Sequence, residues 1–324
     1  MAKYEDIFIR DSLSDQGTVP YPPGYEMCPD LIPKVSPISA GEVPTKLTST
    51  YSEDIGENLE EGQLNYIYLR AKNLSGEART GTITLYYCTE ATYLHSSMWV
   101  NNVIGSKPIS GAAGAVLYCP QPFEWTPPSG EGGYCLVGVV STPQHPNTVP
   151  TMDTVNQWWA WVQGTAGVAN RNVHLVNNIP NTGSQWMLQL ANPDTAAHLQ
   201  VVQVTGTGIP SGSTASIYCS SPDAQPPINT GMQQFGETSP VIASSVLPAG
   251  FSERMVISFQ PPGAFPTGAH VIVKQYVAPN DADDALLADA RPAHLVLGVD
   301  DLTDTGLDDS TQLNYLGCYT YDLV

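Results

Sequence analysis

The chain has 324 residues, of which 42% are hydrophobic and only 13% are charged, and its 12 basic and 31 acidic residues give a formal net charge of −19. This hydrophobic content is enough for packed cores, which excludes a wholly disordered chain. The negative charge excludes nucleic acid and anionic membrane surfaces as favourable partners, and no apolar run is long enough for membrane insertion. Few ions together with 28 Gly and 28 Pro are typical of short strands joined by many turns.

The N-terminal sequence MAKYEDIFIRDSLSD has acidic residues where a signal peptide needs a basic start and an apolar core. We therefore expect synthesis in the cytoplasm without a signal peptide, so that any role outside the cell requires lysis or carriage on a particle. Residues 1–45 contain many turn residues and few periodic apolar ones. We expect them to form an extended arm with at most one strand.

Residues 46–150 contain a series of strand patterns. The segment LNYIYLRAKN (64–73) alternates with period two, and GTITLYYC (81–88) alternates again after a short polar turn, so we expect these two strands to pair as a hairpin. Two further strands are expected at 114–119 and 132–140. Residues 46–150 are thus predicted to form a first β-sandwich.

Residues 151–168 are predicted to form a helical, aromatic linker. Four apolar residues fall at positions i, i+3, i+4 and i+7, on one face of a short helix: Val155, Trp158, Trp159 and Val162. Asp153 or Thr154 is placed to cap this helix and Gly164 to end it. Because the segment is short, a strand remains an open alternative.

Residues 169–278 repeat the order of elements found in the first half. Each half has a strand that ends at an asparagine, Asn73 in one and Asn192 in the other, and each has a later Pro-Pro turn followed by an apolar strand. A shared order with unequal spacing is what insertions in loops produce. We therefore expect a second β-sandwich, and the alternative is two unrelated β domains.

The repeated sequences FEWTPPSGEGGYCLVGVV and ISFQPPGAFPTGAHVIVKQYV resemble the late strands of immunoglobulin-like and CARDB-like adhesion modules. The resemblance covers roughly residues 55–140 and 180–278 and implies β-sandwiches with binding or structural roles. The second copy departs from the pattern by having His270 in place of Tyr134. Cys135 lies on the later strand with no partner on LNYIYLRAKN, so the disulfide of antibody domains is absent.

The six cysteines lack C-x-x-C spacing, and we expect them to be buried free thiols: Cys28, Cys88, Cys119, Cys135, Cys219 and Cys318. A Cys119–Cys135 bridge is the alternative, and it depends on geometry that the sequence does not provide. Residues 279–324 form an acidic C-terminal segment in which AHLVLGV and LNYLGCYTYDLV resemble strands. We expect this segment to pack on a domain or on a neighbouring molecule.

Motifs for bound cofactors are missing from the sequence. The histidines lack metal-ligand spacing, and neither the serine elbow of hydrolases nor a phosphate-binding glycine loop occurs. We expect no cofactor. The acidic run DDLTDTGLDDS departs from a calcium loop because Gln312 takes the place of the final glutamate. A looser Ca²⁺ site is conceivable through four residues, although a solvated acidic loop is favoured: Asp300, Asp301, Asp304 and Asp308.

Aromatic residues are the strongest candidates for a binding role. The chain has 6 Trp and 16 Tyr against 6 Phe, which favours rings that carry a polar group and suit interfaces. The candidates for contact with a partner or a glycan are Trp158, Trp159, Trp161, Trp99 and Tyr93. The competing interpretation is that these rings are wedged between the two sandwiches.

The sequence therefore predicts an all-β protein with two tandem immunoglobulin-like β-sandwich domains, an extended N-terminal arm and a short inter-domain helix. The favoured function is a non-enzymatic structural or adaptor protein that forms homo-oligomers or decorates a larger particle, such as a phage virion or a phage-like injection device. One alternative is a carbohydrate- or surface-binding adhesin that uses Trp and Tyr platforms. A second alternative is a hydrolase with a carboxylate site built from loops.

Overall fold

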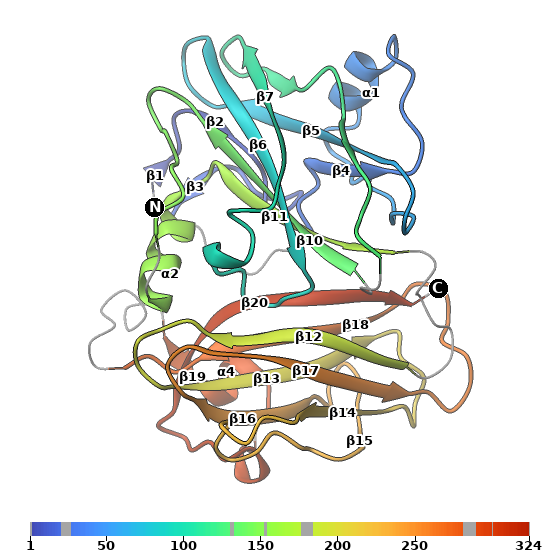
Figure 1. Cartoon of the computed structure of the whole chain (residues 1–324), viewed down its shortest axis with the longest axis vertical. Coiled ribbons are helices and arrows are strands. Elements are labelled where there is room, and N and C mark those ends of the chain that lie inside the picture. Colours follow the sequence, from blue (N-terminus) through green and yellow to red (C-terminus); the bar gives the residue numbers. More distant parts are fainter. Residues whose placement is uncertain are drawn as a thin grey trace. The chain divides into compact units, whose positions relative to one another are not determined.

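The computed structural model describes residues 2–20, 27–129, 133–151, 154–175, 184–280, 290–299 and 301–323. The chain divides into two compact units, both made largely of β-strands (Figure 1). Unit 1 contains Met1–Thr89, Ser96–Thr151 and Trp161–Asn178, and unit 2 contains Glu90–His95, Met152–Ala160 and Ile179–Val324. The protein is all-β, and each unit is built around two main β-sheets.

Unit 1 consists of two main sheets, a separate two-stranded ladder and the helix α1. Its elements are β1 (Ala2–Lys3), β2 (Ile7–Phe8), β3 (Thr18–Val19), β4 (Leu31–Lys34), α1 (Val43–Ser49), β5 (Asn65–Asn73), β6 (Arg79–Thr89), the 3-10 turn η1 (Ser96–Met98), β7 (Val103–Gly111), β8 (Val116–Tyr118), β9 (Phe123–Trp125), β10 (Gly133–Ser141) and β11 (Val168–His174). One sheet has the order β11-β10-β6-β7. The other is built around β5, which pairs with β2, β4, β8 and β9, while β1 and β3 form a separate ladder.

Strands β5 and β6 lie in different sheets, so the hairpin predicted for them is wrong (Figure 1). The chain crosses from one sheet to the other between these strands, and β6 pairs with β7 and β10 instead. Apolar side chains of β5 and β6 meet in the core between the sheets: Ile67, Leu69, Ala71, Ile83 and Leu85. Burial of these apolar side chains between two sheets stabilises the chain more than a local hairpin would, because a lone hairpin leaves one apolar face exposed to water.

The predicted N-terminal arm is part of unit 1 and contains more than one strand. Its strands β2 and β4 pair with β5 at Ile7↔Asn73 and Leu31↔Leu69. Ile7 is fully buried, as is Leu31. Residues 1–45 therefore complete the sandwich, because without them β5 would lack pairing partners along this edge and part of its side-chain cover.

Unit 2 repeats this arrangement with added elements. They are β12 (Ser184–Asn192), β13 (His198–Thr207), β14 (Thr214–Cys219), β15 (Gln233–Gln234), β16 (Val241–Leu247), β17 (Phe251–Gln260), β18 (Ala269–Val277), β19 (Arg291–Pro292), α4 (Ala293–Leu297), the 3-10 turn η3 (Thr303–Thr305) and β20 (Gln312–Leu323). The sheets have the orders β16-β13-β18-β20-β19 and β12-β17-β14-β15. The order β7-β6-β10-β11 in unit 1 matches β16-β13-β18-β20 in unit 2.

The two strand-ending asparagines make the same contacts in their respective units. The Asn73 side-chain Nδ2 donates to the carbonyl of residue 77, 2.7 Å away, and to the carbonyls of Gly111 and Ala112. Nδ2 of Asn192 donates to the carbonyl of residue 196 at 2.9 Å, and to those of Leu247 and Pro248. Each amide thus fixes the crossing between sheets against a turn of the neighbouring strands, as the predicted internal repeat requires.

The helix α2 (Val155–Gly164) is present as predicted. Thr154 Oγ1 accepts a hydrogen bond from the Gln157 N–H at 3.1 Å and so caps the helix, whereas Asp153 lies outside the described residues. The helix ends at Gly164. Its residues are divided between the units, since Ala160 belongs to unit 2 and Trp161 to unit 1. No helix among the described residues is long and apolar enough to cross a membrane.

The described part of the C-terminal segment packs on unit 2. Strand β20 pairs with β18 over most of its length. The segment AHLVLGV, which resembles a strand in sequence, forms the helix α4, and apolar residues of this segment cluster with Val201 and Tyr276. One face of the β16-β13-β18-β20-β19 sheet is thereby covered.

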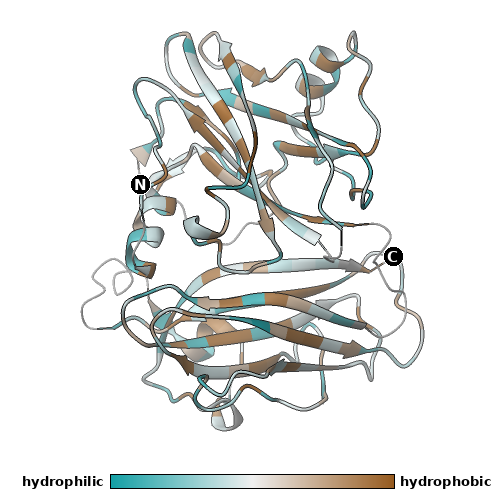
Figure 2. Cartoon of the chain, in the orientation of Figure 1, coloured by the Kyte–Doolittle hydropathy of each residue, from teal (hydrophilic) through white to brown (hydrophobic). Residues whose placement is uncertain are grey.

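Strands of both units carry hydrophobic residues interleaved with hydrophilic ones (Figure 2). All six cysteines are buried and free, as predicted. In unit 1, Cys88 lies opposite Cys135 on paired strands, yet both thiols are unbridged. Burial raises the pKa of the Cys119 thiol to about 12, which keeps this thiol protonated at neutral pH.

Candidate functional site

Three of the five predicted aromatic residues cluster in unit 2. The Tyr93 ring lies edge-on to the Trp158 ring with centroids 4.8 Å apart, and the rings of Trp158 and Trp159 are 6.2 Å apart. The Trp158 Nε1 donates to the carbonyl of Leu94 at 3.0 Å. All three side chains are buried. They join the segment Glu90–His95 to helix α2 within unit 2.

The remaining two predicted residues, Trp99 and Trp161, lie together in unit 1. Their rings are stacked with centroids 6.4 Å apart, and Tyr86 packs edge-on against Trp99. Trp99 is buried, whereas Trp161 is half-buried. The five residues therefore do not form one open platform, and the buried rings have no free face for a sugar. Their part in partner binding stays a prediction.

Two of the four calcium candidates can be placed. Asp301 Oδ1 accepts the N–H of Thr303, and Asp308 Oδ1 accepts the N–H and hydroxyl of Ser310. These hydrogen bonds hold the pKa of each carboxyl below its usual range. Asp300 and the side chain of Asp304 lie outside the described residues. Among the described residues, no group of three or more His, Cys, Asp or Glu is arranged to hold a metal ion.

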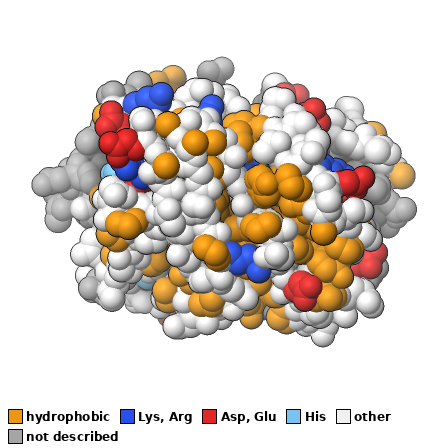
Figure 3. All heavy atoms as spheres, turned by 90° about the horizontal axis from the view of Figure 1, so that it is seen from above, with side chains coloured by type: hydrophobic (Ala, Val, Ile, Leu, Met, Phe, Trp, Pro, Cys, Tyr) orange, Lys and Arg blue, Asp and Glu red, His pale blue; other side chains and the backbone are white. Residues whose placement is uncertain are grey.

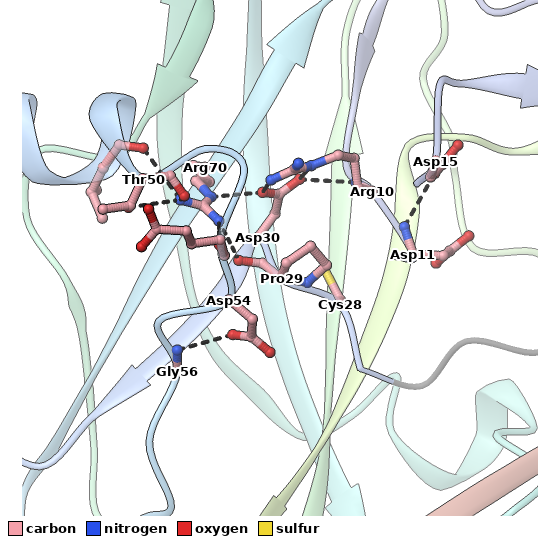
Figure 4. Close-up of polar contacts among 12 residues, drawn as sticks. Arg10, Asp11, Asp15, Cys28, Pro29, Asp30, Thr50, Asp54, Gly56 and Arg70 are labelled. Atoms are coloured by element: carbon pink, nitrogen blue, oxygen red, sulfur yellow. Dashed lines mark hydrogen bonds and ion pairs between the residues drawn. The ribbon is translucent and has the colours of Figure 1, made fainter. Parts of the chain in front are cut away.

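A buried ionic cluster lies under β5 in unit 1, where Arg10 and Arg70 point at the same carboxylate of Asp30 (Figure 4). Asp30 Oδ1 lies 2.6 Å from the Arg10 Nη2 and 2.8 Å from the Arg70 Nε, and all three side chains are at most 4% exposed. Arg70 also donates to the carbonyls of Thr50 and Glu53. The cluster fastens the arm and the end of α1 to β5 and is closed to ligands.

Another buried carboxylate of unit 1, that of Asp6, orients an exposed histidine. Asp6 Oδ2 lies 2.8 Å from the Nδ1 of His145, whose side chain is 43% exposed, and it also accepts the Thr142 hydroxyl. The ring of Tyr4 packs on His145 with centroids 4.7 Å apart. This pair ties the N-terminal segment to the loop after β10.

An open sheet surface in unit 2 has the character of a binding site. On the sheet β12-β17-β14-β15, alternate residues point away from the core, and we call their surface the outer face. Met187, Val256 and Tyr218 lie in register on this face across β12, β17 and β14. Met187 is 50% exposed and Tyr218 is 44% exposed. These three side chains form an apolar row across the sheet.

A groove of about 760 Å³ runs beside this row. It is lined by the adjacent row of Gln185, Ser258 and Ser216, by Met232, and by the turn at residues 260–264. Met232 is 48% exposed. The second of the repeated Pro-Pro turns thus forms a wall of the groove. Its lining side chains are uncharged and offer amide and hydroxyl groups next to apolar ones.

The outer face is poor in charge. Arg254 is the single charged residue at the outward positions of β12, β14 and β17, and Glu253, in the alternate set near the start of β17, is exposed as well. Interfaces are enriched in Met, Tyr and Arg and depleted in Lys, Glu and Asp. Elsewhere too the surface has few ions, as Figure 3 shows for one face of the molecule.

Sequence reasoning missed the outer face because each strand alone shows ordinary alternation. The available signal was Met187 and Tyr218 at outward positions of their strands, where polar residues are usual. Only the pairing of both strands with β17 shows that these residues lie in one row.

Comparison with known proteins finds solved structures of low similarity. No protein-family model and no curated protein matches the chain. The chain is similar to the crystal structure of a CARDB domain from Pyrococcus furiosus in complex with di-metal ions, at 18% identity and a TM-score of 0.23, covering 36% of this chain and 81% of that one. This match agrees with the resemblance predicted from the sequence.

Two further solved structures are similar at lower identity. The calcium-binding domain CBD12 of CALX1.1 has 7% identity and a TM-score of 0.20, with 67% of this chain and 76% of that chain covered. Red sea bream transglutaminase has 13% identity and a TM-score of 0.24, with 68% and 28% covered. Matches at these values carry no argument about this chain.

Proposed function

We propose that the protein is a non-enzymatic structural or adaptor component of a larger assembly, such as a phage virion or a phage-like injection device. The observation that carries this proposal is the outer face of unit 2, where Met187 and Tyr218 are half exposed in one apolar row beside an uncharged groove. Exposed apolar surface on a sandwich that is otherwise well packed is the usual mark of a protein contact.

The proposal is tested by sedimentation of a gently prepared lysate of the source cells through a density gradient. We expect part of the protein to migrate with fast-sedimenting particles, and substitution of Tyr218 by Glu to release it. Leu295→Glu is a matched control, since Leu295 is 67% exposed on α4, away from the outer face. Recovery of all the protein in slow fractions would contradict the proposal.

A neutral glycan is the second candidate ligand for the same face. The Tyr218 ring is 44% exposed, and side-chain amides and hydroxyls of Gln185, Ser216 and Ser258 line the neighbouring groove. Aromatic rings beside uncharged hydrogen-bonding groups suit sugar rings, which present apolar faces and hydroxyl edges. A glycan array probed with the native chain and with Tyr218→Ala separates this candidate, because signals that Tyr218→Ala leaves unchanged do not arise at this face.

A further inference from the structure

We propose that the outer face of unit 2 is a self-association surface, and that two copies of the chain pack it face to face about a two-fold axis. This inference deepens the proposed function by naming a second copy as a partner of the same face. It rests on three features of unit 2: the charge distribution, the cover on the other sheet and the order of residues in the apolar row.

Charge distribution favours the outer face as the place where two copies meet. Each chain carries a formal net charge of −19, so most pairs of surfaces bring carboxylates together and repel. The outward positions of β12, β14 and β17 contain no carboxylate. Two outer faces therefore meet without apposed carboxylates at these positions, and the like charge that remains is Arg254 of one copy facing Arg254 of the other.

The sheet β16-β13-β18-β20-β19 of unit 2 is less accessible to a second copy of the chain. Its face is covered by the C-terminal segment, whose Leu297, Leu302 and Leu313 cluster with Tyr276 on β18. The strands β12, β17 and β14 lie side by side in the other sheet (Figure 1), and Met187 and Tyr218 on their outer face are 50% and 44% exposed.

The apolar row is self-complementary about its middle residue. Val256 lies on β17, between Met187 on β12 and Tyr218 on β14. A two-fold axis through Val256 places Met187 of one copy against Tyr218 of the other, and this contact then occurs twice. Thioether sulfur packs favourably against aromatic rings, and isologous interfaces require this kind of reciprocal match. Two face-to-face sheets accommodate such a contact at the usual spacing of about 10 Å.

The purified full chain is tested by sedimentation velocity and light scattering across about 1–100 µM, a range that covers weak to moderate dimers. We expect a concentration-dependent rise from the 34.7 kDa monomer mass to twice that mass. Higher salt should strengthen the dimer, because it screens repulsion between the acidic chains.

Charge substitutions test the geometry. Met187→Lys and Tyr218→Glu should each weaken the dimer about tenfold or more, because each buries charge at the centre of the contact. The double variant M187K/Y218E should recover much of the loss, since the axis through Val256 brings the two new charges together across the interface. Leu295→Glu is the control and should leave the dimer unchanged, and circular dichroism verifies the fold of every variant.

A chain that stays monomeric throughout the range overturns the inference. So does a dimer that the single variants weaken no more than Leu295→Glu does, or one that the double variant does not restore. The dimer and the proposed function are tested by different outcomes. Particle association without a dimer supports the proposed function and contradicts the dimer. A dimer that never associates with a particle supports the dimer and contradicts the proposed function.

Discussion

Replacing Asp30 by Ala should destabilise unit 1 strongly. The Asp30 carboxylate lies within 2.6–3.0 Å of three Arg10 nitrogens, including the backbone N–H, and within 2.8 Å of the Arg70 Nε. Its side chain is 0% exposed. The substitution leaves two guanidinium groups buried without a counter-ion, which costs about 3–5 kcal/mol. Since whole domains are stable by about 5–15 kcal/mol, unit 1 would lose a large share of its stability.

Urea unfolding followed by tryptophan fluorescence measures this loss. With a denaturant slope of about 2 kcal/mol per molar, a loss of about 4 kcal/mol lowers the midpoint of unit 1 by about 2 M. Glu57→Ala is the control, because the Glu57 side chain is 47% exposed and its partner Lys34 is 10% exposed, so water screens one end of this ion pair. Loss of such a half-exposed pair should cost about 1 kcal/mol. A shift for Asp30→Ala no larger than the shift for Glu57→Ala would refute the reasoning.

Three further predictions concern the repeat, the thiols and the C-terminal segment. Asn73→Ala and Asn192→Ala should each lower the free energy of unfolding by about 2–3 kcal/mol, because each leaves buried carbonyls unpaired. Each variant should lower the urea midpoint of the unit that contains it. A midpoint shift in the same unit for both variants would contradict the repeat. The folded chain should be unreactive to thiol reagents at pH 8, since all six thiols are buried and burial raises the pKa of Cys119 to about 12. In denaturant, six thiols should react. Fast labelling of the folded chain would contradict this prediction. Leu297→Ala should destabilise unit 2 by about 2–5 kcal/mol, because Leu297 is 4% exposed, and a midpoint equal to that of the native chain would show that the C-terminal segment is not part of the core.

The pattern of β5 shows how far sequence reasoning reaches. Period-two alternation identified the strand correctly, and the order of strands and turns predicted the repeated sandwich. This alternation sets Arg70 on the face opposite Ile67 and Leu69, where a charged side chain is expected to meet water, yet the Arg70 side chain is 0% exposed. The face is buried because residues 1–45 return to it with Asp30 as counter-ion, and such a long-range contact leaves no local pattern in the sequence.

The candidate site was less predictable than the fold. Trp158 and Trp159 were recognisable as one helical face, but the chemistry of an indole ring is compatible with burial and with binding alike. Their burial depends on Tyr93, which approaches from a segment far away in the sequence. The sequence did not predict the apolar row of the outer face for a related reason. The row depends on the registers of β12 and β14 against β17, and these registers are set by tertiary packing.

The assignment of residues Glu90–His95 to unit 2 has a consequence for synthesis of the chain. Thr92 donates to Gln275, 183 residues later in the sequence, and the stretch also bridges to β12 through Ala91↔Gln189. As the chain leaves the ribosome from its N-terminus, this short stretch emerges long before the strands that receive it. Unit 2 therefore cannot reach its final packing from the C-terminal half alone, and a fragment that starts at residue 169 would lack one of its own pieces.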